Sequence, residues 1–368
     1  MLRAAQVSSI RGSAETTTDN TAASRITRLH RGRPRVIPML EIALLAVFAA
    51  APMMLPDYLT IFVTRVLILA LLALSFDLVW GYSGIMSFGQ ALFFGGAGYG
   101  VALLARDLEI TSIFIVLPAA LAIGLTLSLA IGTFLLLGRS PPATIFVALG
   151  TLTGSYVADR LARDWYYLGG QNGIPSIPPM TAGGYVFAEG RVYYYLTLSV
   201  LAILYLVCRF VVRSQFGLAL AGVREHEARM AFFGYKVQQL KLIVFSLAGA
   251  IAGLAGGLYA FHEGFVWPDI LGAALSTQIA LYALLGGVGT LIGPVIGVIV
   301  IEILGFWLAD GFPRLWPMIL GLLLLLVVLF SPTGLIGLVA SPRERVGRFG
   351  RSPLPYRHAD EGADDAAA

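Results

Sequence analysis

Charged residues are unusually rare in this sequence. Only 12% of its 368 residues are charged, whereas 58% are hydrophobic and the mean hydropathy is +0.82. Soluble domains carry about 25% charged and about 45–50% apolar residues. A chain so poor in charge cannot cover a water-facing surface, and its polar segments are too short to bury cores of their own. The composition therefore indicates a polytopic membrane protein and excludes large aqueous domains.

Residues that carry chemistry are also few. Cys208 is the single cysteine, so no intrachain disulfide can form, and its place in an apolar run suits a small packing residue. The four histidines are scattered along the chain, and no metal-ligand cluster, nucleophile triad or nucleic-acid patch is visible. We therefore predict that the chain is not an enzyme and holds no cofactor.

Lysine occurs twice, at Lys236 and Lys241, followed by Val and Leu. The phosphate-binding pattern G-x-x-x-x-G-K-[ST] requires a lysine followed by serine or threonine. The chain is therefore not a conventional ATPase in its own right.

The sequence is rich in long apolar runs. A spanning helix needs roughly 20 apolar residues, and about ten runs qualify, which predicts an all-α protein. Glycines interrupt the third run between Gly95 and Gly100 and the eighth between Gly286 and Gly289, as in broken or re-entrant helices, so whether these two cross fully stays open. The runs are 37–55, 59–80, 85–105, 111–137, 143–161, 192–212, 241–262, 272–290, 291–309 and 315–337.

Arginine and lysine in short loops favour the cytoplasm and so predict the orientation. The segment 1–36 is arginine-rich and too polar for a signal peptide, so it is predicted to be a disordered cytoplasmic leader. An even number of crossings returns the tail 341–368, also predicted to be disordered, to the same side. The membrane domain is then 37–340, with its loop 213–241 in the cytoplasm.

That central loop holds the densest charge of the chain, in GVREHEARMAFFGYKVQQLK. It cannot span a bilayer, and it predicts a short amphipathic helix over Val223–Phe233 that ends at Gly234. One interpretation is a solvated loop that merely satisfies the positive-inside rule. The loop nevertheless carries both signs of charge together with apolar side chains at Met230, Phe232 and Phe233, which favours docking to another protein.

Polar residues inside the predicted spans need a reason, because burying them in lipid is costly. One interpretation is a path for a small polar solute; the other is hydrogen bonding between helices, which we favour for single Ser and Thr residues. Asp77 and Glu302 are expected to face protein or water, with Arg65 or Arg209 as partners. The candidates for a path are Asp77, Ser87, Gln90, Thr151, Ser276 and Gln278.

Two glycine-rich strings resemble each other, QALFFGGAG at 90–98 and IALYALLGGVG at 279–289. They run in opposite directions in the predicted topology, as in an inverted repeat with a solute path at the repeat interface. The longest external connection, LGGQNGIPSIPPM, is stiffened by prolines and is either a rigid cap or a contact surface.

Several separated stretches resemble one family in the same order: DLVWGYSGIMSFGQALFFGGAGYG, YYLGGQNGI, GVREHEARMAFFGYKVQQLKLIVFSLAGAIAGLAGGLYAF and ALLGGVGTLIGPVIG. They are similar to the "M"-type permease subunits of bacterial ABC importers for branched-chain amino acids, which are close to the urea-importer permeases. The resemblance runs from about residue 60 to 337. In this family the position of Asp77 more often holds an amide, which leaves the role of this residue open.

The resemblance implies an inner-membrane permease that works by alternating access. Its partners would be a homologous permease, two ATP-hydrolysing subunits and a periplasmic binding protein. A coupling helix in the central loop would sit in a groove of the ATPase, through Arg224, Glu225, Glu227, Arg229, Met230, Phe232, Phe233 and Gly234. The external loop would contact the binding protein through Gly169, Gly170, Gln171, Asn172 and Gly173.

The solute stays open between branched-chain amino acids and urea or short amides, and so does the choice between a hetero- and a homodimeric permease. An ion-coupled secondary transporter is the alternative from another class. It would depend on membrane-embedded carboxylates, for which only Asp77 and Glu302 are available.

Overall fold

The computed structural model describes residues 36–138, 144–311, 318–319, 321–322, 325–326, 329 and 334–339. The chain divides into two units, 1–40 and 41–368. Of the first, only 36–40 is described, as the start of one helix, and the helical bundle belongs to the second. The predicted leader 1–36, the tail 341–368 and most of the tenth run, 315–337, lie outside the described residues.

Helices make up most of the described chain, which confirms the all-α polytopic class. Within the described residues, a two-stranded antiparallel hairpin and three short 3₁₀ turns were not predicted. The α-helices are α2 (Val36–Met54), α3 (Asp57–Ser83), α4 (Gln90–Asp107), α5 (Ile113–Leu136), α6 (Thr144–Asp164), α7 (Arg191–Arg213), α8 (Gln215–Glu225), α9 (Glu227–Phe232), α10 (Val237–Glu263), α11 (Ala273–Gly286), α12 (Ile292–Gly311) and α14 (Ile336–Val339). The 3₁₀ turns are η1 (Tyr166–Leu168), η2 (Gly170–Asn172) and η3 (Pro268–Leu271), and the strands are β1 (Met180–Ala182) and β2 (Tyr185–Phe187).

Each of the first nine apolar runs corresponds to a helix, with ends shifted by a few residues. Within the described residues, 4 helices are both long and apolar enough to cross a membrane by length and composition, namely α3, α5, α7 and α10. These helices support a multi-pass membrane protein, while the total of ten crossings stays a prediction.

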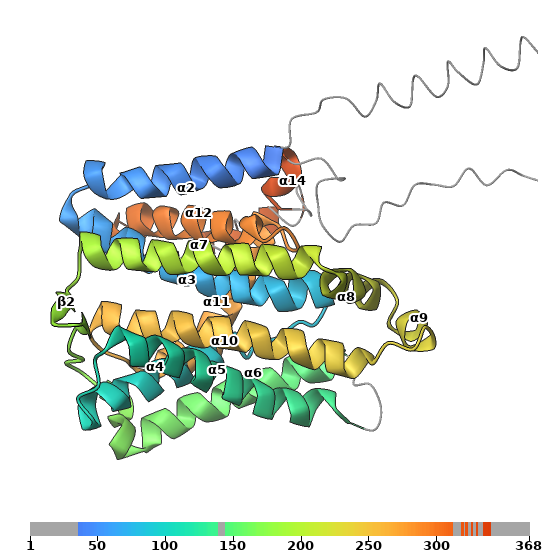
Figure 1. Cartoon of the computed structure of the whole chain (residues 1–368), viewed down its shortest axis with the longest axis horizontal. Coiled ribbons are helices and arrows are strands. Elements are labelled where there is room, and N and C mark those ends of the chain that lie inside the picture. The colour runs from blue at the N-terminus through green and yellow to red at the C-terminus, as the bar shows by residue number, and fades with distance from the viewer. Residues whose placement is uncertain are drawn as a thin grey trace, which may run out of the picture. The chain divides into compact units, whose positions relative to one another are not determined.

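The core is formed around α3 and α10, which lie side by side at the centre of the bundle (Figure 1). Both are apolar all round and buried over most of their length, as expected of helices surrounded by other helices. In contrast, α5 and α7 bury a smaller part of their surface and present large apolar side chains such as Phe114 and Phe210 outward. Such an outer face suits hydrocarbon rather than water.

Small residues bring the helices into close contact. A Cβ atom on Gly253 of α10 would lie 2.6 Å from the Cα atom of Gly124 on α5, and one on Gly98 of α4 would lie 3.2 Å from the carbonyl oxygen of Gly256. Small residues have this role in membrane helix pairs generally. The prediction that glycines break the third run is therefore wrong: α4 continues through Gly95 and Gly100, and these glycines pack against neighbours instead.

The break in this run lies earlier. The helix α3 ends at Gly84, whose φ of 74° glycine adopts without strain, and α4 begins only at Gln90. Residues 84–89 are a non-helical connector. In the eighth run, α11 ends at Gly286, and Gly287 and Gly289 follow with φ of 118° and 82° in the connection to α12, so whether this run crosses fully stays open.

Candidate functional site

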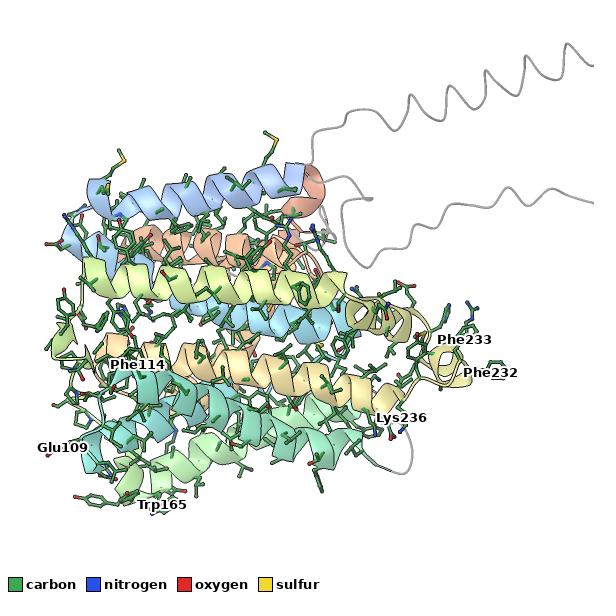
Figure 2. All side chains as sticks on the ribbon, viewed as in Figure 1. Glu109, Phe114, Trp165, Phe232, Phe233 and Lys236 are labelled. Carbon is green, nitrogen blue, oxygen red and sulfur yellow. The ribbon has the colours of Figure 1, made fainter. Side chains whose placement is uncertain are left out.

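The central loop projects from one end of the bundle. Phe232, Phe233 and Lys236 lie at that end, opposite Glu109 and Trp165 (Figure 2). On the short helix α9, Phe232 is 90% exposed, and Phe233, which follows it, is 72% exposed. Two adjacent aromatic side chains held in the open are typical of a protein contact surface.

The single helix predicted over Val223–Phe233 is divided in two. The helix α8 begins earlier and ends at Glu225, His226 adopts φ of −151° and ψ of 89°, and α9 follows. Burial explains the difference, since the apolar residues of α8 pack on the bundle whereas those of α9 do not. The predicted stop at Gly234 is confirmed, with φ of 85°.

The candidate coupling residues divide into anchors and exposed groups. Glu227 accepts a hydrogen bond at 2.7 Å from Nζ of Lys241, a buried residue of α10. Met230 lies against Gly222 of α8, where a Cβ atom would come within 2.7 Å of its sulfur. Lys241 therefore fastens α9 to the bundle. The exposed members are Glu225, Arg229, Phe232, Phe233 and Gly234.

Arg224 points the other way, toward the membrane helices. Its guanidinium donates a hydrogen bond to the carbonyl oxygen of Gly81, in the last turn of α3. A Cβ atom on Gly84 would lie 3.2 Å from Cγ of Arg224, and one on Gly289 would lie 3.2 Å from its Nη1. The side chain thus connects α8 with the end of α3 and with the turn between α11 and α12.

Asp77 binds the same turn, between α11 and α12, from within the bundle. Its carboxylate is fully buried and accepts the backbone N–H groups of Gly289 at 2.6 Å and Leu291 at 3.0 Å. Among the described residues, neither Arg65 nor Arg209 forms an ion pair with Asp77 or Glu302, although Arg65 lies near enough to Glu302 to interact with it electrostatically. Arg65 lies 3.7 Å from Glu263, Arg209 pairs with Glu41, and Glu302 accepts hydrogen bonds from Tyr282 and Gln278.

Several of the candidate path residues gather around the connector 84–89. The N–H of Phe88 donates to Oγ1 of Thr151 at 3.0 Å, and its carbonyl accepts from Ser276 at 2.6 Å. Ser155, which is not among the candidates, donates to the same carbonyl at 2.9 Å. Non-helical backbone inside a membrane protein must find such partners. These hydroxyls therefore have a structural role, and a role in a solute path stays a prediction.

Gln90 begins α4 beside these hydroxyls. Its Oε1 accepts a hydrogen bond from Ser75 at 3.2 Å, whereas its fully buried Nε2 has no hydrogen-bond partner within the described part of the chain. Ser87, also fully buried, accepts the N–H of Gly89 at 3.2 Å. Gln278 lies elsewhere, with Nε2 at 2.5 Å from the Tyr282 hydroxyl. The six candidates thus form three groups, around Phe88, Gly289 and Glu302.

Replacing Ser276 with alanine is expected to cost about 1–3 kcal/mol of unfolding free energy, because the carbonyl of Phe88 and the N–H of Ala91 both lose this partner. The matched control is Thr277→Ala, since the exposed Thr277 bonds to Ala273 within its own helix. Thermal unfolding in detergent measures both variants. Equal midpoints for the two would contradict the structural role.

The external loop is fastened to the bundle by backbone hydrogen bonds. Gly169, Gly170 and Gly173 have positive φ, and Ile174 exchanges two backbone hydrogen bonds with Val266, at 2.8 and 3.0 Å. Gly173 is buried against Val266, so of the five candidates for a partner contact only Gln171 and Asn172 are exposed. The nearby hairpin β1–β2 was missed, although Gly183–Gly184 between two short β-prone segments is a turn signal.

Among the residues that the structure describes, no group of three or more His, Cys, Asp or Glu residues could hold a metal ion. The polar groups of the bundle are paired mainly with backbone atoms or with one another.

Comparison with known proteins supplies the family. The sequence model of one protein family, described as the permease component of the branched-chain amino acid transport system, matches residues 58–328, which is most of the chain. Among curated relatives, the permease protein LivM of Escherichia coli K12 is 28% identical over 318 residues, covering 80% of this chain and 74% of LivM. BraD of Pseudomonas aeruginosa is 26% identical over 288 residues, 73% of this chain and 91% of BraD.

A further relative is the autoinducer 2 import system permease LsrC of Escherichia coli SMS-3-5, 30% identical over 146 residues, which are 37% of this chain and 42% of LsrC. All three relatives are named as permease proteins of transport systems. With its helical bundle and a family match over most of its length, this chain belongs to the family of branched-chain amino acid transport system permease components.

Proposed function

We propose that this chain is the M-type permease subunit of an ATP-driven ABC importer that moves branched-chain amino acids or similar small polar solutes across the bacterial inner membrane. The proposed coupling to the ATPase rests on the exposed side chains of Phe232, the last residue of α9, and Phe233, which follows it. ATP is hydrolysed by a partner subunit, and this chain holds no cofactor. The other partners are a homologous permease subunit and a periplasmic binding protein, and exposed Gln171 and Asn172 are available to contact the latter.

The helix α9 is proposed to sit in a groove of the ATPase subunit. Aromatic side chains that enter a pocket on a partner commonly dominate binding energy. The Glu227–Lys241 ion pair fixes α9 to α10, so that a force on α9 reaches the membrane helices. Arg224 offers a second route, through α8 to the end of α3.

Ten crossings with both termini in the cytoplasm complete the proposed topology, with α9 on the cytoplasmic side. Leader 1–36, membrane domain 37–340 and tail 341–368 are its parts. An inverted repeat is supported by the match between α3 and α10. Each has 27 residues and is capped by a glycine with φ of 74° or 69°, and each is followed by a connector without α-helix and then by a shorter α-helix.

The names of LivM and BraD support branched-chain amino acids as the solute. Urea or short amides remain the alternative within the class. An ion-coupled secondary transporter is disfavoured, because Asp77 and Glu302 both accept hydrogen bonds from groups of this chain. ATP-dependent uptake of leucine, measured against urea in vesicles that hold the complete transporter, tests this part.

The double replacement of Phe232 and Phe233 by alanine is expected to abolish co-purification of the ATPase and ATP-driven uptake. Hot-spot residues cost about 2 kcal/mol or more each, which is roughly 30-fold in affinity. Phe114→Ala is the matched control, since Phe114 is 77% exposed at the opposite end of the bundle. Undiminished ATPase capture by the double variant would contradict the proposal.

A further inference from the structure

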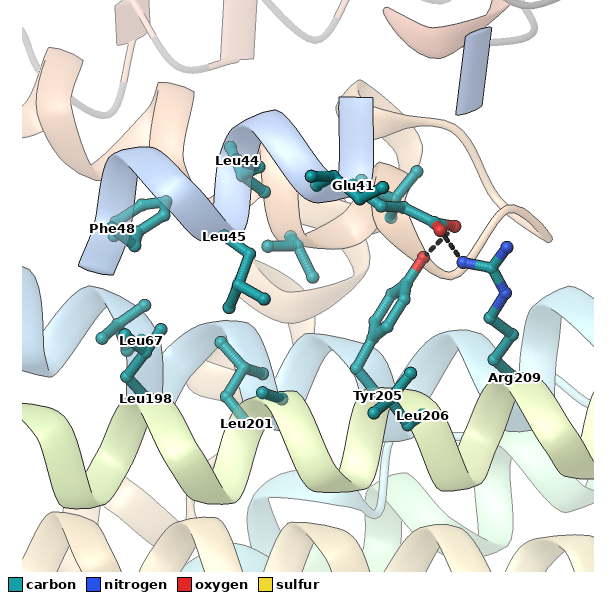
Figure 3. Close-up of a pocket in the computed structure, with 14 residues that line it drawn as sticks. Glu41, Leu44, Leu45, Phe48, Leu67, Leu198, Leu201, Tyr205, Leu206 and Arg209 are labelled. Atoms are coloured by element: carbon teal, nitrogen blue, oxygen red, sulfur yellow. Dashed lines mark hydrogen bonds and ion pairs between the residues drawn. The ribbon is translucent and has the colours of Figure 1, made fainter. Parts of the chain in front are cut away.

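A groove lined almost entirely by apolar side chains opens between α2, α3, α7 and α12 (Figure 3). It encloses about 200 Å³. Its floor is well buried, with Leu67 at 1%, Ile292 at 2% and Leu201 at 8% exposure, whereas Leu206 at its rim is 62% exposed. The open side of the groove is therefore continuous with the apolar outer surface of the bundle. In a membrane protein such a surface faces hydrocarbon.

One end of the groove is polar. Glu41 accepts a hydrogen bond from the Tyr205 hydroxyl at 2.7 Å and forms an ion pair with Arg209 (Figure 3). Arg213 lies one helical turn beyond Arg209 and is exposed at the end of α7. This end of the groove thus has two guanidinium groups and one carboxylate, so its net charge is positive.

We propose that this groove binds one anionic phospholipid from the leaflet nearest α8. An acyl chain lies over Leu67, Leu198 and Leu201, and the phosphate contacts Arg209 at the end of the groove and Arg213 one helical turn beyond it. The direction is set by the chain, because α8 begins directly after Arg213 and Ser214. A phospholipid matches both features, since its tail needs an apolar slot that opens to the bilayer and its phosphate needs the surplus positive charge at the headgroup level. A free polar solute would leave the long apolar lining unused.

The test uses the complete transporter purified in mild detergent and exposed to mixed micelles of phosphatidylglycerol and phosphatidylcholine. Bound phospholipid is then quantified by native mass spectrometry. Wild type is expected to retain one phospholipid, preferentially phosphatidylglycerol. Ala202→Phe, which fills the groove, is expected to reduce retention at least tenfold. The matched control is Ile203→Phe, because Ile203 is 60% exposed and does not line the groove.

Charge recognition is tested separately. Arg213→Gln is expected to lower the preference for phosphatidylglycerol about fivefold, the factor expected for one arginine beside an anionic headgroup. Arg191→Gln removes the same charge from the opposite end of α7 and is expected to leave the preference unchanged. Equal lipid retention by wild type and Ala202→Phe would overturn the proposal, and so would equal preferences in wild type and Arg213→Gln.

A helix of the second permease is the competing occupant. The photoreactive replacement Leu206→benzoylphenylalanine, at the rim of the groove, is expected to crosslink to phospholipid. Crosslinking to another protein subunit instead would overturn the proposal. None of these outcomes depends on the identity of the transported solute or on the role of α9.

Discussion

Replacing Asp77 with leucine is expected to cost about 2–6 kcal/mol of unfolding free energy. The carboxylate accepts the backbone N–H groups of Gly289 and Leu291, and leucine accepts neither. Each buried N–H that loses its partner costs about 1–3 kcal/mol. Because leucine is similar in size, lost hydrogen bonding rather than a cavity accounts for the effect. Thermal unfolding and folded yield in detergent measure it.

Asparagine at the same position separates the two bonds. Asp77→Asn keeps one acceptor oxygen and turns an amide toward the other N–H, so about half of the loss is expected, roughly 1–3 kcal/mol. Asp57→Asn, at the exposed start of the same helix, is the control and should change stability by less than about 0.5 kcal/mol. If leucine at position 77 were as stable as aspartate, the carboxylate would not hold the turn.

Much of the helical framework could be predicted because burial in a bilayer requires long apolar runs. The full extent of the connector 84–89 could not, since the apolar runs 59–80 and 85–105 leave only residues 81–84 between them, whereas α4 begins at Gln90. What stabilises it comes from Thr151, Ser155 and Ser276, far along the chain. The glycines of α4 led to the opposite error. They were expected to interrupt the helix, whereas they allow close contact with Ile270 and Gly256.

The candidate site shows the same limit. Sequence patterns predicted that the loop around Arg224 docks to another protein and that the buried Asp77 needs a polar partner. They could not predict that these residues meet at one turn, since Asp77 and Gly289 are 212 positions apart. The hydrogen bonds to Asp77 come from backbone N–H groups, which leave no mark in the residue type, and the arginine near it is Arg224 rather than Arg65 or Arg209. Only tertiary packing brings the three segments together.

Arg224→Gln is expected to lower ATP-driven uptake about tenfold or more while the ATPase subunit remains bound. The guanidinium of Arg224 donates to Gly81 at the end of α3, next to the turn that Asp77 holds. This places a side chain of the coupling loop in contact with α3 and with the turn that precedes α12. A hydrogen bond from a charged donor contributes about 1.5–3 kcal/mol, which corresponds to a factor of roughly ten or more.

The measurements are leucine uptake per ATP hydrolysed in vesicles and the amount of ATPase that co-purifies. Arg224→Lys keeps a donor without the planar fork and should give an intermediate uptake. Lys236→Gln removes a positive charge from the same loop, at an exposed position, and should change uptake by less than about twofold. If Arg224→Gln lost ATPase binding in proportion to uptake, Arg224 would act at the subunit interface. Normal uptake by this variant would mean that motion reaches the membrane helices through the Glu227–Lys241 pair alone.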